Sequence, residues 1–295
     1  MNQVENGKAF EFSIAKHFAE KLNVPLQQNS SLKVASSCYI KLHDNMRHWI
    51  DRAADESTTF LLCHDKQFEK AESVYLQEDR MGVQGDVRDI LLQIPKLNLG
   101  ISAKHNHKAV KHSRLSNSID FGKEWTTYSC NSSYFKAIQP VFADLTKMKE
   151  QGMFFRDIAG KEARIYLPVL TAFEDELKNL CENYREQFVI KLFKYLLGKF
   201  DFYKVIRDEK IVFIQSMNMD GTLGWGKKWK VPAQIENIKR KRGSNNTLLV
   251  SFTGGWQLSF RIHSAKSKVE PSLKFDIQFI GLPQEIARHE INLET

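Results

Sequence analysis

Two short apolar runs that follow each other in the middle of the chain restrict its fold more than any other feature. The first covers Asp89–Ile94 and the second Leu97–Ala103, with Pro95 between them. Each run has the length of a strand, and the residues between them suffice only for a short turn, so the pattern predicts two adjacent strands. Segments with helical periodicity lie on both sides of this pair, which indicates an α/β core.

The period of the apolar residues changes near residue 200. Before that point, helical spacing predicts helices over Asn6–Leu22, His43–Ala54, Lys66–Glu78, Ser133–Lys149 and Lys161–Leu197. After it, alternation predicts strands over Lys210–Ser216, Leu248–Phe252, Gln257–His263 and Lys274–Ile280. We therefore expect a core with a helical region over residues 1–200 and a β-rich region over residues 201–295.

Positive charge is concentrated in two segments. The 295 residues carry a net charge of +8, and Trp225–Arg242 alone holds seven Lys and Arg residues against one acid, Glu236. A second basic stretch, Lys104–Lys123, interleaves lysines and an arginine with three histidines. Such clusters suit a polyanion such as nucleic acid, and the alternative is a solvated basic loop. Trp225, Trp229 and Trp256 could stack on DNA, although we expect at least one of them to be core.

Composition excludes several protein classes. With 42% hydrophobic and 26% charged residues the chain is typical of a globular protein. We expect no membrane span and no export signal, because no apolar run approaches about 18 residues. The four cysteines lie far apart without metal-ligand spacing, which predicts reduced, buried thiols in a cytoplasmic protein.

A lysine at the end of the second apolar run indicates chemistry. Alternation places Ser102 and Lys104 on one face of this strand. A buried ammonium needs a partner, and Asp86 or Asp89 of the preceding segment could supply it. A metal-dependent phosphodiesterase uses this arrangement: the carboxylate holds a divalent cation, and the lysine orients or deprotonates the attacking water. The alternative is an ordinary salt bridge.

Several blocks of sequence resemble one family. They are Asn6-Gly-Lys-Ala-Phe-Glu, Gly85-Asp-Val-Arg-Asp, Ile101-Ser-Ala-Lys-His-Asn-His-Lys-Ala-Val-Lys-His-Ser-Arg-Leu-Ser, Phe260-Arg-Ile-His-Ser and Pro271-Ser-Leu-Lys-Phe-Asp. The chain resembles the HaeIII-type restriction endonucleases, within the PD-(D/E)XK nucleases. The resemblance implies a mixed central sheet flanked by helices, with a β-rich C-terminal region. It also implies an enzyme that makes Mg²⁺-dependent double-strand cuts at a short palindrome, GGCC in the namesake case.

The same resemblance implies partners and site residues. The partners are double-stranded DNA, a second copy in a homodimer, and functionally a cognate DNA methyltransferase. Asp89 or Asp86 matches the metal-binding aspartate, and Lys104 matches the motif lysine. We favour Asp89, because it directly precedes the apolar strand, with Asp86 as a possible second ligand. Ser102 departs from the superfamily, where Glu or Asp is usual, and serine is a poor ligand for a hard cation. We therefore expect the second carboxylate from Glu11; the alternative is an exposed helix glutamate.

Further residues are candidates for DNA contact. Those expected to face the backbone near the scissile phosphate are Asn106, His107, Lys108, Lys111, His112 and Arg114. Those expected to grip DNA or read bases are Lys227, Lys228, Arg240, Arg242 and Arg261. The run His105-Asn106-His107 also permits an HNH nuclease, which we do not favour because no matching downstream block follows. The alternative function is a non-catalytic basic DNA-binding protein; RNA binding is less favoured.

Overall fold

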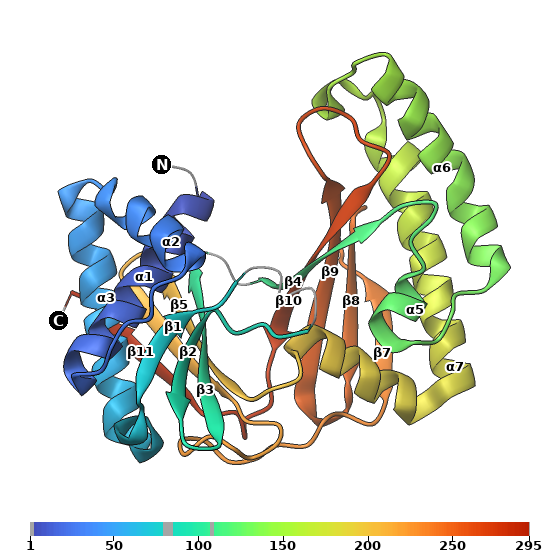
Figure 1. The fold of residues 1–295 in the computed structure, drawn as a ribbon. Helices are drawn as coiled ribbons and strands as arrows, with labels where there is room; N and C mark the ends of the chain where they lie inside the picture. The colour runs from blue at the N-terminus through green and yellow to red at the C-terminus, as the bar shows by residue number, and fades with distance from the viewer. Residues whose placement is uncertain (1–2, 79–84, 107–108, 295) are drawn as a thin grey trace. The chain divides into compact units, whose positions relative to one another are not determined.

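The chain forms two compact units. The computed structural model describes residues 3–78, 85–106 and 109–294. The first unit combines residues 1–108, 197–230 and 284–295, and the second combines residues 109–196 and 231–283 (Figure 1). Both units are assembled from separate stretches of sequence, so the division differs from the expected one at residue 200.

A six-stranded mixed sheet forms the centre of the first unit. Its strands are β1 (Ser73–Leu76), β2 (Ile90–Ile94), β3 (Leu97–His105), β5 (Phe202–Asp208), β6 (Ile211–Met217) and β11 (Arg288–Asn292), in the order β1-β2-β3-β5-β6-β11. Only β3 and β5 are parallel among these neighbours. The predicted pair of adjacent strands is confirmed as β2 and β3, which pair in the register Leu92↔Leu99.

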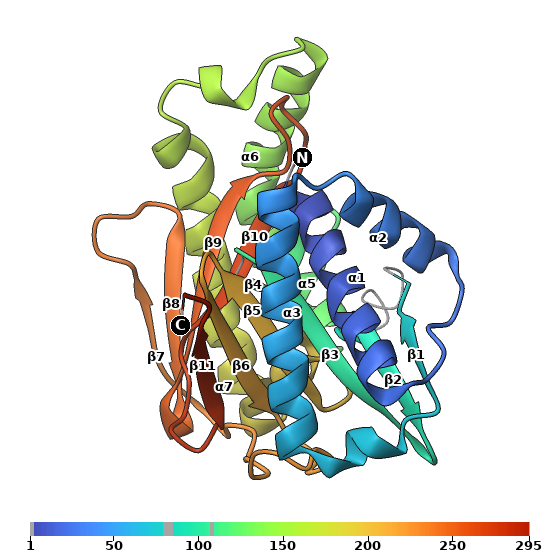
Figure 2. The same cartoon turned by 90° about the vertical axis from the view of Figure 1, so that its left-hand side faces the viewer.

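Three helices complete this unit: α1 (Gln3–Leu22), α2 (Ser30–Ile40) and α3 (Asp44–His64). The apolar stripe of α1, with Phe10, Ile14 and Phe18, is fully buried in one core cluster with strand residues such as Ile101 and Tyr203. Figure 2 shows α1 and α3 running side by side across the sheet. The helix predicted at the N-terminus is therefore confirmed, and its burial holds it against β3.

The helix expected over Lys66–Glu78 is wrong. The chain forms a short 3₁₀ helix, η1 (Lys66–Lys70), and then enters β1. Pairing with β2 in the register Val74↔Leu92 buries Val74 and Leu76, and this burial outweighs the helical propensity of the segment. The elements α2, β1, β5 and β11 were not predicted, nor were the strands Ala109–Leu115 and Ile235–Arg240 and the short helix Phe121–Thr126.

A five-stranded antiparallel sheet forms the centre of the second unit. Its strands are β4 (Ala109–Leu115), β7 (Ile235–Arg240), β8 (Thr247–Phe252), β9 (Trp256–Ser264) and β10 (Leu273–Gly281), in the order β4-β10-β9-β8-β7. Its helices are α5 (Phe121–Thr126), α6 (Ser132–Glu150) and α7 (Leu167–Leu197), with short helical turns η2 (Phe155–Asp157), η3 (Glu162–Tyr166) and η4 (Thr253–Gly255).

Aromatic side chains fill the core of the second unit. Phe260 of β9 and Phe275 of β10 contact Trp125 of α5 and Phe173 of α7. Trp256 is also buried there, and in the first unit Trp229 is buried. The expectation that at least one tryptophan belongs to the core is confirmed.

Among the described residues, no helix is both long and apolar enough to span a membrane. All four cysteines are free; Cys38 and Cys130 are buried as expected, whereas Cys181 is half-buried and Cys63 is exposed.

Arg88 and Asp86 form a buried ion pair that depends on a glycine. Arg88 Nε and Nη2 donate to the two carboxylate oxygens of Asp86 at 2.8 and 2.7 Å, and Nη1 donates to the Asn98 carbonyl at 2.9 Å. The arginine stem crosses β3 at Gly100, where a Cβ atom would lie 1.9 Å from Arg88 Cδ. Only glycine therefore fits beneath this ion pair.

We expect Gly100→Ala to lower the free energy of unfolding by about 3–5 kcal/mol, because the displaced arginine leaves a buried carboxylate without its partner. Urea denaturation measures the change. Gly7→Ala in α1 is the control: a Cβ atom there meets nothing within 4 Å, so this variant should be stabilised by about 0.5–1 kcal/mol. Equal stability of the two variants would contradict the role of Gly100.

Candidate active site

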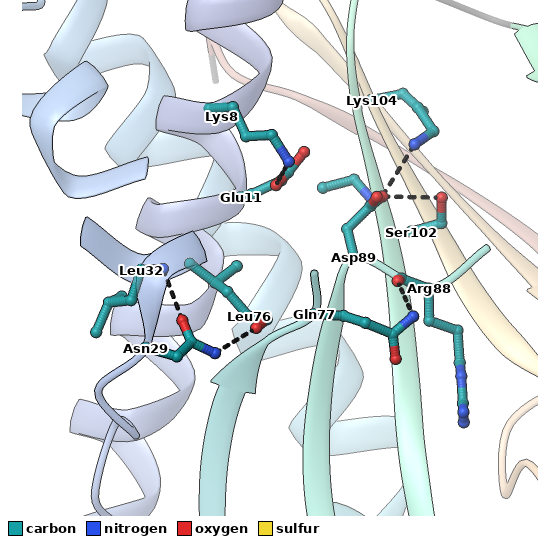
Figure 3. A network of polar contacts seen from close by, with 11 residues as sticks. Lys8, Glu11, Asn29, Leu32, Leu76, Gln77, Arg88, Asp89, Ser102 and Lys104 are labelled. Atoms are coloured by element: carbon teal, nitrogen blue, oxygen red, sulfur yellow. Dashed lines mark hydrogen bonds and ion pairs between the residues drawn. The ribbon is translucent and has the colours of Figure 1, made fainter. Parts of the chain in front are cut away.

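Asp89 receives three hydrogen bonds at one carboxylate oxygen. It precedes β2, and its Oδ2 accepts from Ser102 Oγ at 3.1 Å, Ala103 N at 2.8 Å and Lys104 Nζ at 2.9 Å (Figure 3). The Asp89 and Lys104 side chains remain 21% and 27% exposed, so both can meet a substrate. The expected carboxylate partner of the strand-end lysine is therefore present, and it is Asp89.

Glu11 adds a second carboxylate to this group. Figure 3 shows it on the side of α1 that faces the strands carrying Asp89 and Lys104. Lys8 Nζ donates to Glu11 Oε2 at 2.9 Å, and the glutamate is buried. Burial and the charge of Asp89 raise the pKa of Glu11 to about 7, although Lys8 and Lys104 lower it. Glu11 is thus close enough to Asp89 for their charges to interact. It is buried, so the alternative of an exposed helix glutamate is wrong.

Lys204 is a second lysine at this site that the sequence analysis missed. It lies on β5 directly opposite Ser102 of β3, on the face that carries Lys104. Its side chain is buried, and burial together with the charge of Lys104 lowers its pKa to about 7, while Asp89 raises it. Lys204 was not among the predicted site residues, because no strand was predicted over Phe202–Asp208 and its position opposite Ser102 depends on that strand.

Asp86 does not join this group. Both of its oxygens accept hydrogen bonds from Arg88, and it is buried. The Gln77 side chain also donates to the Arg88 carbonyl at 2.9 Å, which fixes the backbone that leads into Asp89 (Figure 3). The structure therefore gives Asp86 a role in holding this segment rather than in facing Lys104.

His105 is buried next to an arginine. Its Nδ1 lies 3.1 Å from Arg207 Nη1, and burial together with Arg207 lowers the pKa of His105 to about 4. His107 lies outside the described residues. Among the described residues, no three His, Cys, Asp or Glu side chains gather as they would around a metal. These observations give no support to an HNH site.

Asp89 and Glu11 nonetheless fit a divalent cation of the magnesium type. Magnesium in proteins is held by one or two carboxylates, together with waters and substrate phosphates, and does not need a complete protein cage. Among the described residues all hydrogen bonds to the Asp89 carboxylate go to Oδ2, which leaves Oδ1 for a ligand. A cation would also offset the repulsion between the two carboxylates, which adds to the larger effect of burial in raising the pKa of Glu11.

The expected DNA-binding residues fall into different environments. Lys111 points into the second unit: its Nζ donates to the Tyr195 carbonyl at 3.0 Å, and burial lowers its pKa to about 8. Arg240 is tied to α7 by Glu174 at 3.3 Å and Thr171 at 2.7 Å. The other described candidates are exposed: Asn106, His112, Arg114, Lys227, Lys228, Arg242 and Arg261. Lys108, like His107, lies outside the described residues.

The basic segment Trp225–Arg242 is shared between the units. Its first part, up to Lys230, belongs to the first unit, and the part from Val231 onward belongs to the second. Each unit therefore carries a share of the excess positive charge.

The chain is similar to proteins of one known family. The sequence profile of the HaeIII restriction endonuclease family matches residues 7–283. The chain is 36% identical to the type II restriction enzyme HaeIII of Haemophilus aegyptius, over 99% of this chain and 97% of that protein. No solved structure matches the chain significantly.

The raised pKa of Glu11 predicts a pH-dependent stability. The folded state keeps this carboxyl protonated up to about pH 7, whereas an unfolded glutamate ionises near pH 4.5, so wild-type stability falls as the pH rises between these values. In metal-free buffer, Glu11→Gln should match the wild type at pH 4 and exceed it by about 1–3 kcal/mol at pH 8.

Chemical denaturation at both pH values measures this difference. The control is Glu20→Gln on the same helix, because Glu20 is exposed and forms only a 3.7 Å ion pair with Lys16. Its stability should change by less than about 0.5 kcal/mol at either pH. A Glu11→Gln effect that is equal at pH 4 and pH 8 would refute the shift.

Proposed function

The chain belongs to the HaeIII restriction endonuclease family, and from this premise we propose that it makes Mg²⁺-dependent double-strand cuts at a short palindromic DNA site. Membership makes the protein a type II site-specific deoxyribonuclease with DNA as its substrate. The observation that carries the metal-dependent mechanism is the grouping of Asp89, Lys104 and Glu11.

Asp89 and Glu11 are the proposed metal ligands. Asp89 is held in place by the Ser102 hydroxyl and the Ala103 amide, so its free oxygen is oriented without using further side chains. In this proposal Ser102 donates a hydrogen bond to Asp89 and does not bind the metal itself. Its position therefore does not need an acidic residue. When bound, a divalent cation would stabilise negative charge on the scissile phosphate.

Lys104 is the proposed catalytic lysine. Its ammonium is fixed by Asp89 at 2.9 Å and remains partly exposed, so it can orient a water molecule toward the phosphorus and offset developing charge. Lys204 lies on the same face of the sheet as Lys104, and its buried amine, whose pKa is lowered to about 7, adds a second titratable nitrogen beside the catalytic lysine. In-line attack by water would break the bond between phosphorus and the 3′ oxygen, which leaves one product with a 3′-hydroxyl and the other with a 5′-phosphate.

The assignment to the PD-(D/E)XK nucleases has support in the first unit. The mixed sheet, the adjacent strands β2 and β3 with Asp89 and Lys104 at their ends, and α1 packed across the sheet are the parts that this fold uses. The position of Ser102 differs from the superfamily pattern, and Glu11 supplies the missing carboxylate in this proposal.

The finer biological assignments follow from the family. We propose a GGCC-type recognition site, a homodimer that matches the two-fold symmetry of a palindrome, and a cytoplasmic enzyme paired functionally with a methyltransferase. The non-catalytic DNA-binding alternative is not favoured, because family membership and the Asp89–Lys104 pair both point to cleavage.

We expect the purified protein to cut plasmid DNA into discrete fragments with Mg²⁺ and to leave it intact with EDTA. Lys104→Ala should lower the cleavage rate by at least about 100-fold, because it removes charge stabilisation at the phosphate, while DNA binding in a gel-shift assay is retained. Lys16→Ala, an exposed lysine of α1, is the control and should cut at the wild-type rate. Wild-type cutting by a folded Lys104→Ala protein would exclude this lysine from catalysis.

The Mg²⁺ requirement distinguishes the two proposed ligands from Asp86. Asp89→Asn should abolish cutting at any Mg²⁺ concentration, whereas Glu11→Gln should shift the half-maximal Mg²⁺ concentration upward by about 10-fold or more, as loss of one of two carboxylates implies. Asp86→Asn should lower stability without moving this concentration, because Asp86 is paired with Arg88. An unchanged Mg²⁺ requirement in Glu11→Gln would exclude Glu11 as a ligand.

A further inference from the structure

The sheet of the second unit has one apolar and one polar face. The apolar face packs Phe260 and Phe275 into the core. The strand registers place polar side chains on the opposite face, from β4, β10, β9 and β8. We call this set the polar face: His112, Arg114, Thr247, Ser259, Arg261, His263, Lys274, Asp276 and Gln278.

A buried aspartate lies at the centre of the polar face. Asp276 of β10 pairs with Arg261 of β9 on one side and with His112 of β4 on the other. Its Oδ2 accepts from Arg261 Nη2 and from Gln278 Nε2, each at 3.0 Å, and its Oδ1 lies 3.9 Å from His112 Nδ1. The Asp276 side chain is 5% exposed and that of Arg261 is 55% exposed. The carboxylate therefore lies beneath the guanidinium that it holds.

Stability alone gives little reason for this arrangement. An ion pair to a largely exposed arginine contributes little to folding, and burying a carboxylate has a cost. Among the described residues, Asp276 Oδ1 is also buried without a hydrogen-bond partner. The arrangement does fix the orientation of two side chains. An ionised carboxylate can only accept hydrogen bonds, so Asp276 orients the Gln278 amide with its NH₂ group toward the carboxylate and holds one edge of the Arg261 guanidinium.

The remaining donors of Arg261 are available to a ligand. Asp276 engages Nη2, and no other hydrogen bond from a described residue reaches this guanidinium. A planar guanidinium presents its N–H groups as a fork that matches the N7 and O6 acceptors of guanine in the major groove. Holding the fork in one orientation lowers the entropy lost on binding.

We propose that Asp276, braced by Gln278, is a positioning residue that holds Arg261 to read a guanine of the DNA site. The inference rests on the proposed function, since it supposes a site-specific enzyme whose target contains a G·C pair. Arg114 differs from Arg261 although it lies on the same face. It donates only to the Ser272 hydroxyl at 3.2 Å and has no carboxylate behind it among the described residues, which suits a phosphate contact.

Replacement of single guanines by 7-deazaguanine tests the proposal. Sequencing the fragment ends of a wild-type digest first identifies the site, without any assumption about Arg261. Duplexes are then made in which one guanine of each half-site lacks N7, and kcat/KM is measured for each. Wild type should lose about 3- to 10-fold at one guanine position, because 7-deazaguanine keeps O6 and removes one of the two acceptors of a bidentate base contact.

The variants should respond differently at that position. Arg261→Ala should cut the unmodified duplex about 10- to 100-fold more slowly than wild type and lose nothing further with 7-deazaguanine. Asp276→Asn should retain cutting but show a weaker response to the modified base, because the arginine is no longer held. The control Arg114→Ala should lose activity on all duplexes equally, respond to 7-deazaguanine like wild type, and reduce the salt dependence of binding.

The outcomes separate this inference from the proposed function. An Arg261→Ala protein that responds to every 7-deazaguanine as wild type does would overturn the reading role, while its cutting would still support the nuclease. A wild-type response that survives unchanged in Asp276→Asn would overturn the positioning role. Failure of the wild type to cut any DNA with Mg²⁺ would remove the proposed function and this inference together.

Discussion

The parallel pairing of β3 with β5 is the constraint on which the rest of the structure depends. Neighbouring parallel strands cannot be joined by a tight turn, so a long connection must carry the chain from the end of β3 back to the start of β5. Here that connection includes β4, α5, α6 and α7, which are built into the second unit. This pairing therefore accounts for the mixed sheet and for the placing of residues 109–196 in the second unit, whereas residues 231–283 join that unit from the later connection between β6 and β11.

The same strand pair also sets the chemistry of the site. β3 presents Ser102 and Lys104 on one face, and β5 places Lys204 opposite Ser102. Asp89 enters from the antiparallel neighbour and accepts from three consecutive residues of β3. Three lysines, Lys8, Lys104 and Lys204, lie close to the carboxylates of Asp89 and Glu11. The pKa values of Glu11 and Lys204 are both about 7, so a bound cation or a small change in pH alters the local charge.

The polar groups of the two units follow one physical principle on different scaffolds. In each unit a carboxylate accepts several hydrogen bonds and orients a cationic side chain that stays accessible: Asp89 with Lys104, and Asp276 with Arg261. By contrast, Asp86 and Arg88 are both buried, and their pair serves the packing beneath Gly100. Exposure of the cation therefore separates the two functional candidates from the structural pair.

The sequence by itself determined the strand pair β2–β3 and the helix α1, because periodicity and a short turn act over few residues. It reduced the expected partners of Lys104 to Asp86 and Asp89. It misassigned Lys66–Glu78, where pairing of β1 with β2 outweighs propensity. Only the tertiary structure decided that Asp86 turns to Arg88, that Lys204 approaches the site, and that Asp276 lies beneath Arg261. It also decided between the two alternatives for Glu11, which is buried and affected by the charge of Asp89. These relations depend on burial, strand register or the space left at Gly100, none of which leaves a periodic pattern in the sequence.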